Sequence, residues 1–314
     1  MSCLPGFISN AQAYIDSLED NEEKVEFTEG KLTKSINLYR FKRLKSLICC
    51  GSDTNQLPLL PDTIETLWCN CNSLRQIQTL PLSLANFDIS YNSISKLPPL
   101  PHKLEVLNCG FNEIIYLPKL PITIQRLDCS FNRLNYLPEI CNSQLHYLEC
   151  SDNYITLLPP LSSVLVNLYC GDNHLEKLPS LPNSILRIDC SSNRIKHLPK
   201  LPENLRHLVC FSNQLYYLPL LPLTLDTIHF ENNPMCEYFN ASNIELLRKQ
   251  VSIVYNFRST YYHLKFKQKF RNLLWTKREE KARTFYSPEN LKRLVDVIDD
   301  DDDNHNLLLI LENW

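Results

Sequence analysis

The chain has 314 residues, of which 44% are hydrophobic and 21% are charged, a composition that is ordinary for a globular protein. Its formal net charge of -3 and its pI near 6.3 give no global positive field, which argues against a protein that follows nucleic-acid phosphates along its length. No apolar run is long enough to span a membrane and the first residues lack the pattern of a signal peptide, so we expect a cytoplasmic protein.

Residues 1–43 precede a long repetitive region and are predicted to form its N-terminal cap. A helix is expected near residues 10–18, and the alternation in KVEFTEGKLTKSINLYRF, residues 24–41, indicates a strand or a partial repeat. Such a segment is expected to cover the exposed core edge of the first repeat, because terminal units close the ends of repeat proteins.

Residues 44–239 read as ten units of about twenty residues, with one extra residue between Leu137 and Leu145. Each unit follows L-x-x-L-x-C-x-x-N-x-L-x-x-L-P-x-L-P-x-x, and residues 104–123 are a nearly ideal copy. The asparagine of this pattern is found at Asn72, Asn92, Asn112, Asn132, Asn153, Asn173, Asn193, Asn213 and Asn233. A fixed period of this kind predicts a solenoid whose stacked units share one continuous core.

The first half of each unit is predicted to be a short strand. Leu107 and Cys109 alternate with Val106, Asn108 and Gly110, so the first two side chains point inward and the other three point outward. One strand per unit builds a parallel sheet on the concave side. The L-P-x-L-P half favours an extended, polyproline-like return over the convex side rather than a helix.

The repeated asparagines and cysteines are interpreted as structural. A buried asparagine amide can bond backbone groups left unpaired where a strand becomes a turn. Eight of the 13 cysteines share one repeat position, which Ile89 and Phe230 occupy in the other two units, so the position is predicted to be apolar core. Metal binding and disulfides between successive units are the less favoured alternatives, because the thiols lie in a row with parallel side chains.

The outward side chains of the sheet are the predicted binding surface for a protein partner with a basic or mixed patch. Aromatic side chains there offer stiff contact area, while the repeated carboxylates repel phosphate. No convergent nucleophile, base and oxyanion donor is recognisable, so we predict no enzyme activity, no cofactor and no metal site. The candidate partner-binding residues are Trp68, Asp88, Asn108, Asp128, Tyr147, Glu149, Tyr169, Asp189, Phe211 and His229.

Residues 240–314 are predicted to form a helical C-terminal cap followed by an acidic tail. The expected apolar stripe consists of Phe266, Phe270, Leu273 and Leu274. A further helix is expected to start at Ser287, before the aspartate run of residues 299–303.

The C-terminal region also carries a local positive charge. Residues 248–283 contain eleven Lys or Arg and only two acidic residues. The aromatic residues interleaved with them are Tyr261, Tyr262, Phe266, Phe270 and Trp275. Association with nucleic acid or with an anionic membrane is the alternative to a simple capping role.

The repeats resemble the short, twenty-residue leucine-rich repeats of bacterial type III secreted effectors, over about 200 residues. This resemblance implies a leucine-rich repeat array but no particular activity. The ubiquitin-ligase domain that follows the repeats in some effectors has a catalytic cysteine, and here the last cysteine is Cys236, at the edge of the array.

The C-terminal region resembles the ending of many giant-virus (mimivirus-like) proteins. The shared landmarks are Leu274, Trp275, Arg278, Tyr286, Pro288, Leu291, Asp299 to Asp303 and Trp314. Together with the repeats they identify the chain as similar to leucine-rich repeat proteins of giant viruses. That resemblance implies a viral protein acting in the cytoplasm of an infected host. It names no partner and no oligomeric state.

Overall fold

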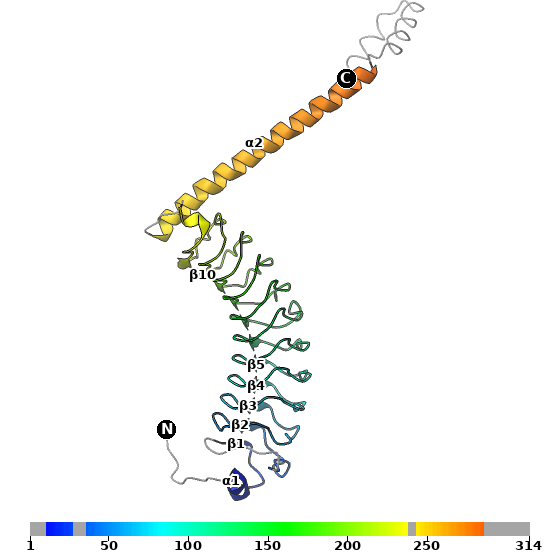
Figure 1. Cartoon of the computed structure of the whole chain (residues 1–314), viewed down its shortest axis with the longest axis vertical. Coiled ribbons are helices and arrows are strands. Elements are labelled where there is room, and N and C mark those ends of the chain that lie inside the picture. Colours follow the sequence, from blue (N-terminus) through cyan, green and yellow to red (C-terminus); the bar gives the residue numbers. More distant parts are fainter. Residues whose placement is uncertain (1–10, 28–35, 238–242, 286–314) are drawn as a thin grey trace, which may run out of the picture. The chain divides into compact units, whose positions relative to one another are not determined.

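The computed structural model describes residues 11–27, 36–237 and 243–285 of the chain. The chain divides into two compact units, residues 1–252 and 253–314. The first unit contains a short helix, α1 (Ala11–Ser17), and an eleven-stranded sheet in which every strand pairs with its neighbours in sequence order. The strands lie along one side of the stacked units and the return segments along the other (Figure 1).

Each strand is three residues long and pairs in parallel with the next. The strands are β1 (Lys24–Glu26), β2 (Ser46–Ile48), β3 (Thr66–Trp68), β4 (Asn86–Asp88), β5 (Val106–Asn108), β6 (Arg126–Asp128), β7 (Tyr147–Glu149), β8 (Asn167–Tyr169), β9 (Arg187–Asp189), β10 (His207–Val209) and β11 (Thr227–His229). Strands β2 to β11 come from the ten predicted units, and β1 is the partial repeat expected before them. The predicted solenoid with a parallel sheet is therefore confirmed.

The alternation within a unit places the side chains as predicted. Leu107 and Cys109 are fully buried, whereas the flanking Val106 and Asn108 are half-buried on the outer face. Gly110 is the exception, because it is buried beneath neighbouring side chains rather than free on the surface. The return segments between β2 and β11 contain no helix in the part of the chain that the structure describes, as the repeated prolines predict.

The asparagine ladder, which comprises the nine repeated asparagines, forms the predicted bonds to the backbone. The side-chain amide of Asn132 donates to the carbonyl oxygens of Cys109 and Cys129 at 2.9 and 3.2 Å. Its Oδ1 accepts a 2.9 Å bond from the backbone N–H of Ile114 in the preceding unit. Each asparagine thus satisfies backbone groups of two units at once and joins them where strand becomes turn.

The thiol ladder is apolar core, as predicted. Its members, Cys49, Cys69, Cys109, Cys129, Cys150, Cys170, Cys190 and Cys210, are fully buried. All twelve cysteines in the described residues are free thiols. Burial raises the pKa of the Cys109 thiol well above its ordinary value, and the carboxylates of Asp128 and Asp88 raise it further. Such thiols remain protonated and pack as small hydrophobic side chains.

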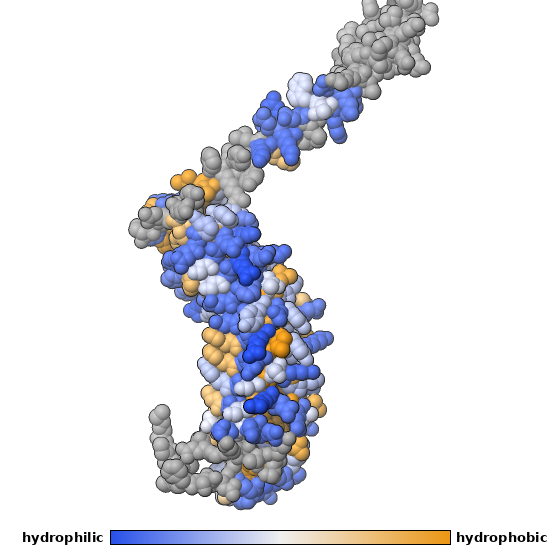
Figure 2. Space-filling view, viewed as in Figure 1, coloured by the Kyte–Doolittle hydropathy of each residue, from blue (hydrophilic) through white to orange (hydrophobic). Residues whose placement is uncertain are grey.

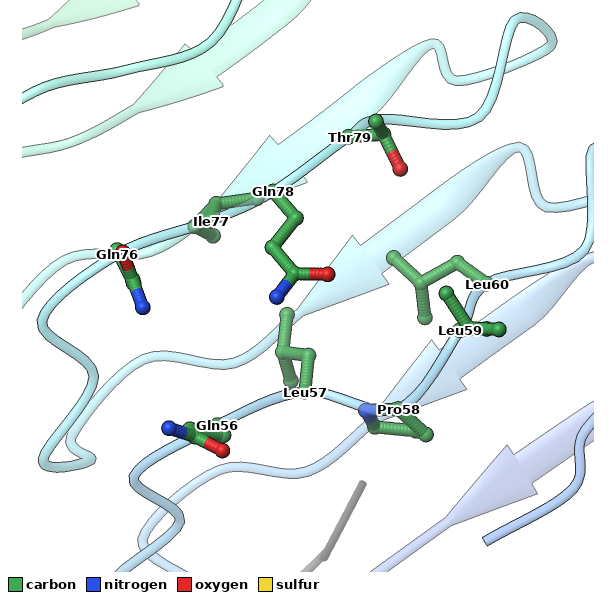
Figure 3. Close-up of a pocket in the computed structure, with 9 residues that line it drawn as sticks. All are labelled: Gln56, Leu57, Pro58, Leu59, Leu60, Gln76, Ile77, Gln78 and Thr79. Atoms are coloured by element: carbon green, nitrogen blue, oxygen red, sulfur yellow. The ribbon is translucent and has the colours of Figure 1, made fainter. Parts of the chain in front are cut away.

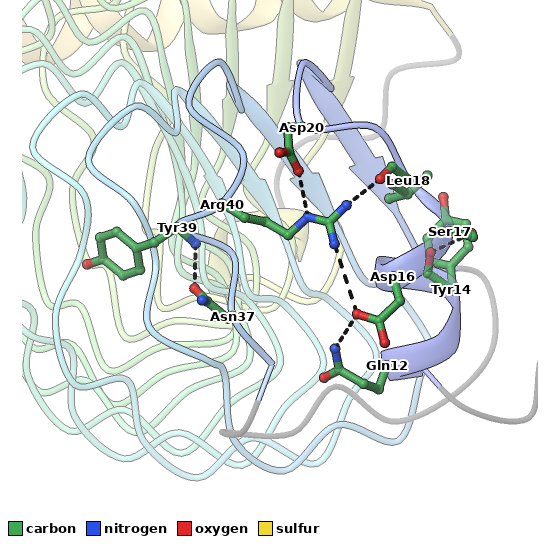
Figure 4. A network of polar contacts seen from close by, with 9 residues as sticks. All are labelled: Gln12, Tyr14, Asp16, Ser17, Leu18, Asp20, Asn37, Tyr39 and Arg40. Atoms are coloured by element: carbon green, nitrogen blue, oxygen red, sulfur yellow. Dashed lines mark hydrogen bonds and ion pairs between the residues drawn. The ribbon is translucent and has the colours of Figure 1, made fainter.

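The N-terminal cap is held by Arg40, which lies in the turn before the first unit. Its guanidinium donates to the carbonyl oxygen of Leu18, and its Nε lies 3.1 Å from Asp20 Oδ1 (Figure 4). Ile15 of α1 and Val25 of β1 are buried in the core of the array. The predicted helix and strand of this region are both present, and they cover the apolar edge of the array.

The C-terminal end of the array is closed by a 3-10 helix, η1 (Pro234–Glu237), and by the start of α2 (Ile244–Phe285). Met235, Leu247 and Val251 are buried in the core. The guanidinium of Arg248 donates to the carbonyl oxygens of Pro222, Leu223 and Leu225 at 3.3, 3.0 and 2.7 Å. Because that side chain is only 13% exposed, these bonds are shielded from water.

The helix expected in the C-terminal region is present as α2. The sequence places the start of this region at residue 240, and the first turns of α2, as far as Ser252, belong to the compact unit of the array. Phe266 of the predicted apolar stripe is 71% exposed, and the side chains of Phe270, Leu273 and Leu274 lie outside those that the structure describes. Among the described side chains of α2, Leu247 and Val251 are buried. The predicted helix at Ser287 and the acidic run at residues 299–303 lie outside the described residues.

Candidate functional site

The predicted partner-binding residues are brought together by the register of the sheet. Eight of them, Trp68, Asp88, Asn108, Asp128, Glu149, Tyr169, Asp189 and His229, are the third residues of their strands and belong to one row of paired positions. Tyr147 starts β7 and flanks this row, whereas Phe211 lies two residues beyond the end of β10. Adjacent members are about 4.8 Å apart, the spacing of paired strands.

The carboxylates of this row have a structural role that the sequence did not reveal. Asp128 Oδ1 accepts bonds from the backbone N–H and the hydroxyl of Ser130, at 3.1 and 2.7 Å. Asp88 and Asp189 bond in the same way to the serines two residues after them. Each aspartate therefore closes the turn at its strand end and is held in a fixed orientation.

The four acidic side chains of the row, Asp88, Asp128, Glu149 and Asp189, are called the acidic row below. None of them has an ion pair within 4.0 Å among the residues that the structure describes. Partial burial raises the pKa of Glu149. Hydrogen bonds from Ser151 lower it, the nearby carboxylates of Asp128 and Asp189 raise it further, and the net shift is upward. The acidic row thus carries negative charge that no ion pair within the described array neutralises, while Arg126 and Arg187 lie on the same face two residues before Asp128 and Asp189.

Aromatic side chains beside the acidic row are held rigidly. The guanidinium of Arg126 lies 3.7 Å from the centre of the Tyr147 ring, and that ring lies 5.5 Å from Tyr169. Trp68 is 45% exposed on the third strand. Aromatic side chains lose little conformational entropy when a partner covers them, because they have few rotatable bonds.

A second aromatic group was not predicted. Tyr91, Phe111 and Phe131 lie in the turns just after β4, β5 and β6, and their rings stack at centroid distances of 4.1 and 4.0 Å. Their twenty-residue spacing is visible in the sequence, but the direction of the side chains follows from the turn backbone. Figure 2 shows hydrophobic patches among the mostly hydrophilic side chains on the visible side of the array.

A small depression between the return segments after β2 and β3 is a different kind of site. It is lined by Gln56, Leu57, Pro58, Leu59, Leu60, Gln76, Ile77, Gln78 and Thr79 (Figure 3). Its amides and leucines include no acid, base or thiol. Within the described ranges no three His, Cys, Asp or Glu side chains converge to hold a metal ion, and no helix is long and apolar enough to cross a membrane.

Comparisons with known proteins give fold neighbours. No protein-family model and no curated protein matches the chain. YopM from Yersinia enterocolitica is 30% identical over 60% of this chain and 51% of its own, with a TM-score of 0.47. InlJ from Listeria monocytogenes, described as including a cysteine ladder, is 22% identical over 73% of this chain and 52% of its own, with a TM-score of 0.58.

Toll, solved in its complex with Spatzle from Drosophila, is 20% identical over 71% of this chain and 41% of its own, with a TM-score of 0.50. The chain spans about half the length of the YopM and InlJ chains that it matches. Together with the parallel sheet of stacked units, the likeness to InlJ shows that the fold is a leucine-rich repeat solenoid. The giant-virus resemblance finds no counterpart among these neighbours.

Proposed function

We propose that this chain is a non-enzymatic protein-binding module that recognises a basic or mixed protein surface with its sheet face. The observation that carries the proposal is the acidic row, whose four carboxylates have no ion pair among the described residues and lie on a rigid sheet. Charge that is left unneutralised on a fixed surface favours a complementary partner and speeds its association.

A protein suits this face better than a nucleic acid does. The carboxylates of Asp128 and Glu149 would repel phosphate groups, whereas Trp68 and Tyr147 offer the amphipathic contact area that dominates protein interfaces. That contact area is extended along the sheet by the remaining candidate residues, which are Asn108, Tyr169, Phe211 and His229. Among the fold neighbours, Toll is described in complex with Spatzle, and FLRT2 in an octameric complex with Latrophilin 3 and Unc5D, so the fold can present a protein-binding surface.

The chemistry of the array supports a role without catalysis. A cysteine nucleophile acts as its thiolate, and burial raises the pKa of the ladder thiols, for example those of Cys129 and Cys170. The exposed side chains of the sheet face are ordered in a line rather than converging on one point. A line of contacts suits an extended surface and not a reacting bond.

The setting of this module is part of the proposal. The C-terminal landmarks, from Leu274 to Trp314, resemble the ends of giant-virus proteins, and we propose a viral protein that acts in the host cytoplasm. Fractionation of infected cells with an antibody against this chain tests the location. Recovery of the protein outside the cytoplasmic fraction would contradict it.

The binding proposal is tested with a variant that removes charge but keeps the hydrogen bonds. Asn108 occupies the row and accepts a bond from the N–H of Gly110 as the aspartates accept theirs, so Asp88→Asn, Asp128→Asn and Asp189→Asn are compatible with the fold. Glu149→Gln completes this neutral-row variant. Proteins that co-purify with the full chain from expressing cells should be lost from it.

The control carries the same change of charge on other surfaces. Asp62→Asn, Glu139→Gln, Glu176→Gln and Glu203→Gln neutralise four exposed carboxylates of the return segments. This control variant should retain the partners that the neutral-row variant loses. Equal recovery of every co-purifying protein by both variants would refute the assignment of the sheet face.

The basic part of α2 supports a second candidate function, association with nucleic acid or an anionic membrane. The side chains of Lys267, Lys269 and Lys277 are exposed, as are Phe266 and Trp275. Exposed cations interleaved with aromatic rings can follow a phosphate backbone or a lipid surface. Salt-sensitive binding to RNA or to phosphatidylserine vesicles, lost when the three lysines become glutamate, would support this role, and absence of such binding would exclude it.

A further inference from the structure

The turn position before the repeated asparagine has the same unusual backbone in all ten units. Its residues are Gly51, Cys71, Tyr91, Phe111, Phe131, Asp152, Asp172, Ser192, Ser212 and Asn232, and every φ lies between 47° and 64°. Residues with a Cβ adopt this left-handed conformation at a cost, which is smallest for Asn and Asp. Seven units place Gly or a small residue there, so the fold itself has no need of an aromatic side chain.

Three consecutive units nevertheless carry one. The rings of Tyr91, Phe111 and Phe131, called the aromatic stack, are 51%, 36% and 44% exposed. Their planes are within 10° and 14° of parallel at a centroid distance close to 4 Å, which follows from the spacing of the strands and not from the preferred geometry of aromatic pairs. The result is a preformed apolar strip that is held in place before any partner arrives.

The charges around the aromatic stack indicate what it contacts. The next two turn positions are Asp152 and Asp172, and neither has an ion pair among the described residues. Asp88 and Asp128 lie three residues before Tyr91 and Phe131, at the ends of the strands that lead into those turns. Along the array, the aromatic stack is therefore followed by the carboxylates of Asp152 and Asp172. On the sheet side, it is preceded by the carboxylates of Asp88 and Asp128.

We infer that the aromatic stack and the two aspartates after it form a docking strip for an extended protein segment in which apolar residues adjoin lysine or arginine. The inference rests on the proposed function and specifies its partner. From Tyr91 to Asp172 the strip spans four unit spacings, about 19 Å, which an extended chain of about six residues covers. Its apolar residues cover the rings, and its basic residues face Asp152 and Asp172.

The test uses the full chain and a display library of random dodecapeptides as the probe. Selection should enrich peptides with aliphatic or aromatic residues next to Lys or Arg. The variant Tyr91→Asn, Phe111→Asn and Phe131→Asn should bind a selected, fluorescently labelled peptide at least tenfold more weakly. It should fold normally, because Asn232 adopts the same backbone at this position with φ 55°.

Two further variants make the outcome specific. Asp152→Asn with Asp172→Asn should also weaken the peptide at least tenfold, whereas Tyr116→Asn with Tyr136→Asn, which removes exposed rings from the return segments, should leave binding unchanged. Selection of no peptide, or equal binding by all variants, overturns the inference. Concentration-dependent dimerisation that the asparagine variant abolishes would place a second copy on the strip and also overturn it.

Failure of this inference is distinguishable from failure of the proposed function. Peptides that lose affinity only with the neutral-row variant would refute the docking strip and leave the sheet face as the binding surface. Peptides that lose affinity only with the stack and Asp152 variants would support the strip and move the partner away from the acidic row.

Discussion

Replacing Asn173 by alanine measures how much one member of the asparagine ladder contributes to stability. The side chain is 5% exposed, and its Oδ1 is the acceptor of a 2.9 Å bond from the N–H of Ile155. Its amide donates to the carbonyl oxygens of Cys150, Cys170 and Gly171. The substitution removes all these bonds without changing any apolar contact of the strands.

The expected loss follows from which backbone groups keep another partner. The carbonyl oxygens of Cys150 and Cys170 each retain a second amide, from Asn153 and Asn193. The N–H of Ile155 has no other acceptor among the described residues, and a buried donor that loses its acceptor costs about 1–3 kcal/mol. The carbonyl oxygens of Cys150, Cys170 and Gly171 also lose the bond from the Asn173 amide. Adding this to the cost of the unpaired N–H, we expect a loss of about 3 kcal/mol in the free energy of unfolding.

Urea denaturation followed by far-UV circular dichroism measures this loss. Because repeat arrays can unfold in parts, hydrogen exchange of β7, β8 and β9 should be measured alongside. The matched control is Asn135→Ala, an exposed asparagine of a return segment, which should change stability by less than about 0.5 kcal/mol. Equal effects of the two substitutions would refute the structural role of the ladder.

Three other outcomes are expected. Alkylation of the native protein should modify the exposed Cys71 rapidly and leave the buried Cys170 unmodified, as measured by peptide mass spectrometry. Prompt labelling of the ladder thiols would contradict the repeat register that buries them. Arg248→Ala should lower the free energy of unfolding by about 2–4 kcal/mol in a denaturant titration, because the carbonyl oxygens of Leu223 and Leu225 lose their donor, while that of Pro222 keeps only the bond from the N–H of Leu225. An unchanged midpoint would show that α2 does not seal the array. Because burial raises the pKa of Glu149 and of Asp152, they take up protons at higher pH than ordinary carboxyl groups, whose pKa is about 4. Lowering the pH from neutral should therefore weaken binding of a basic peptide while slightly raising the stability of the array, and affinity that stays constant down to the ordinary pKa would contradict this.

The repeating part of the fold could be predicted because its pattern is strict. The spacing of asparagines such as Asn112 and Asn132 fixes the register, and the register fixes which side chains are buried, as Leu107 and Cys109 show. The row from Trp68 to His229 follows from the same register. Regular periodicity carries this information without knowledge of any contact between distant residues.

The remaining features depend on contacts that periodicity does not encode. The bonds between Asp128 and Ser130 need the turn geometry at the strand end, and the stacking of Phe111 on Phe131 needs the left-handed backbone of that turn. Arg248 belongs to a basic segment in the sequence, yet it is distinguished from its neighbours by its bonds to three carbonyl oxygens of the last two units. A repeat pattern does not predict individual contacts of this kind.

The extra residue of the fifth unit also has a practical use. It lies on a return segment, where Ser143 bonds back to the carbonyl oxygen of Ile140, and the pairing of Asp128 with Glu149 continues across it undisturbed. The array thus already accepts a longer connection at this point. A short epitope or a spectroscopic probe inserted next to Asn142, which is exposed, would report on the intact protein without touching the surface proposed to bind its partner.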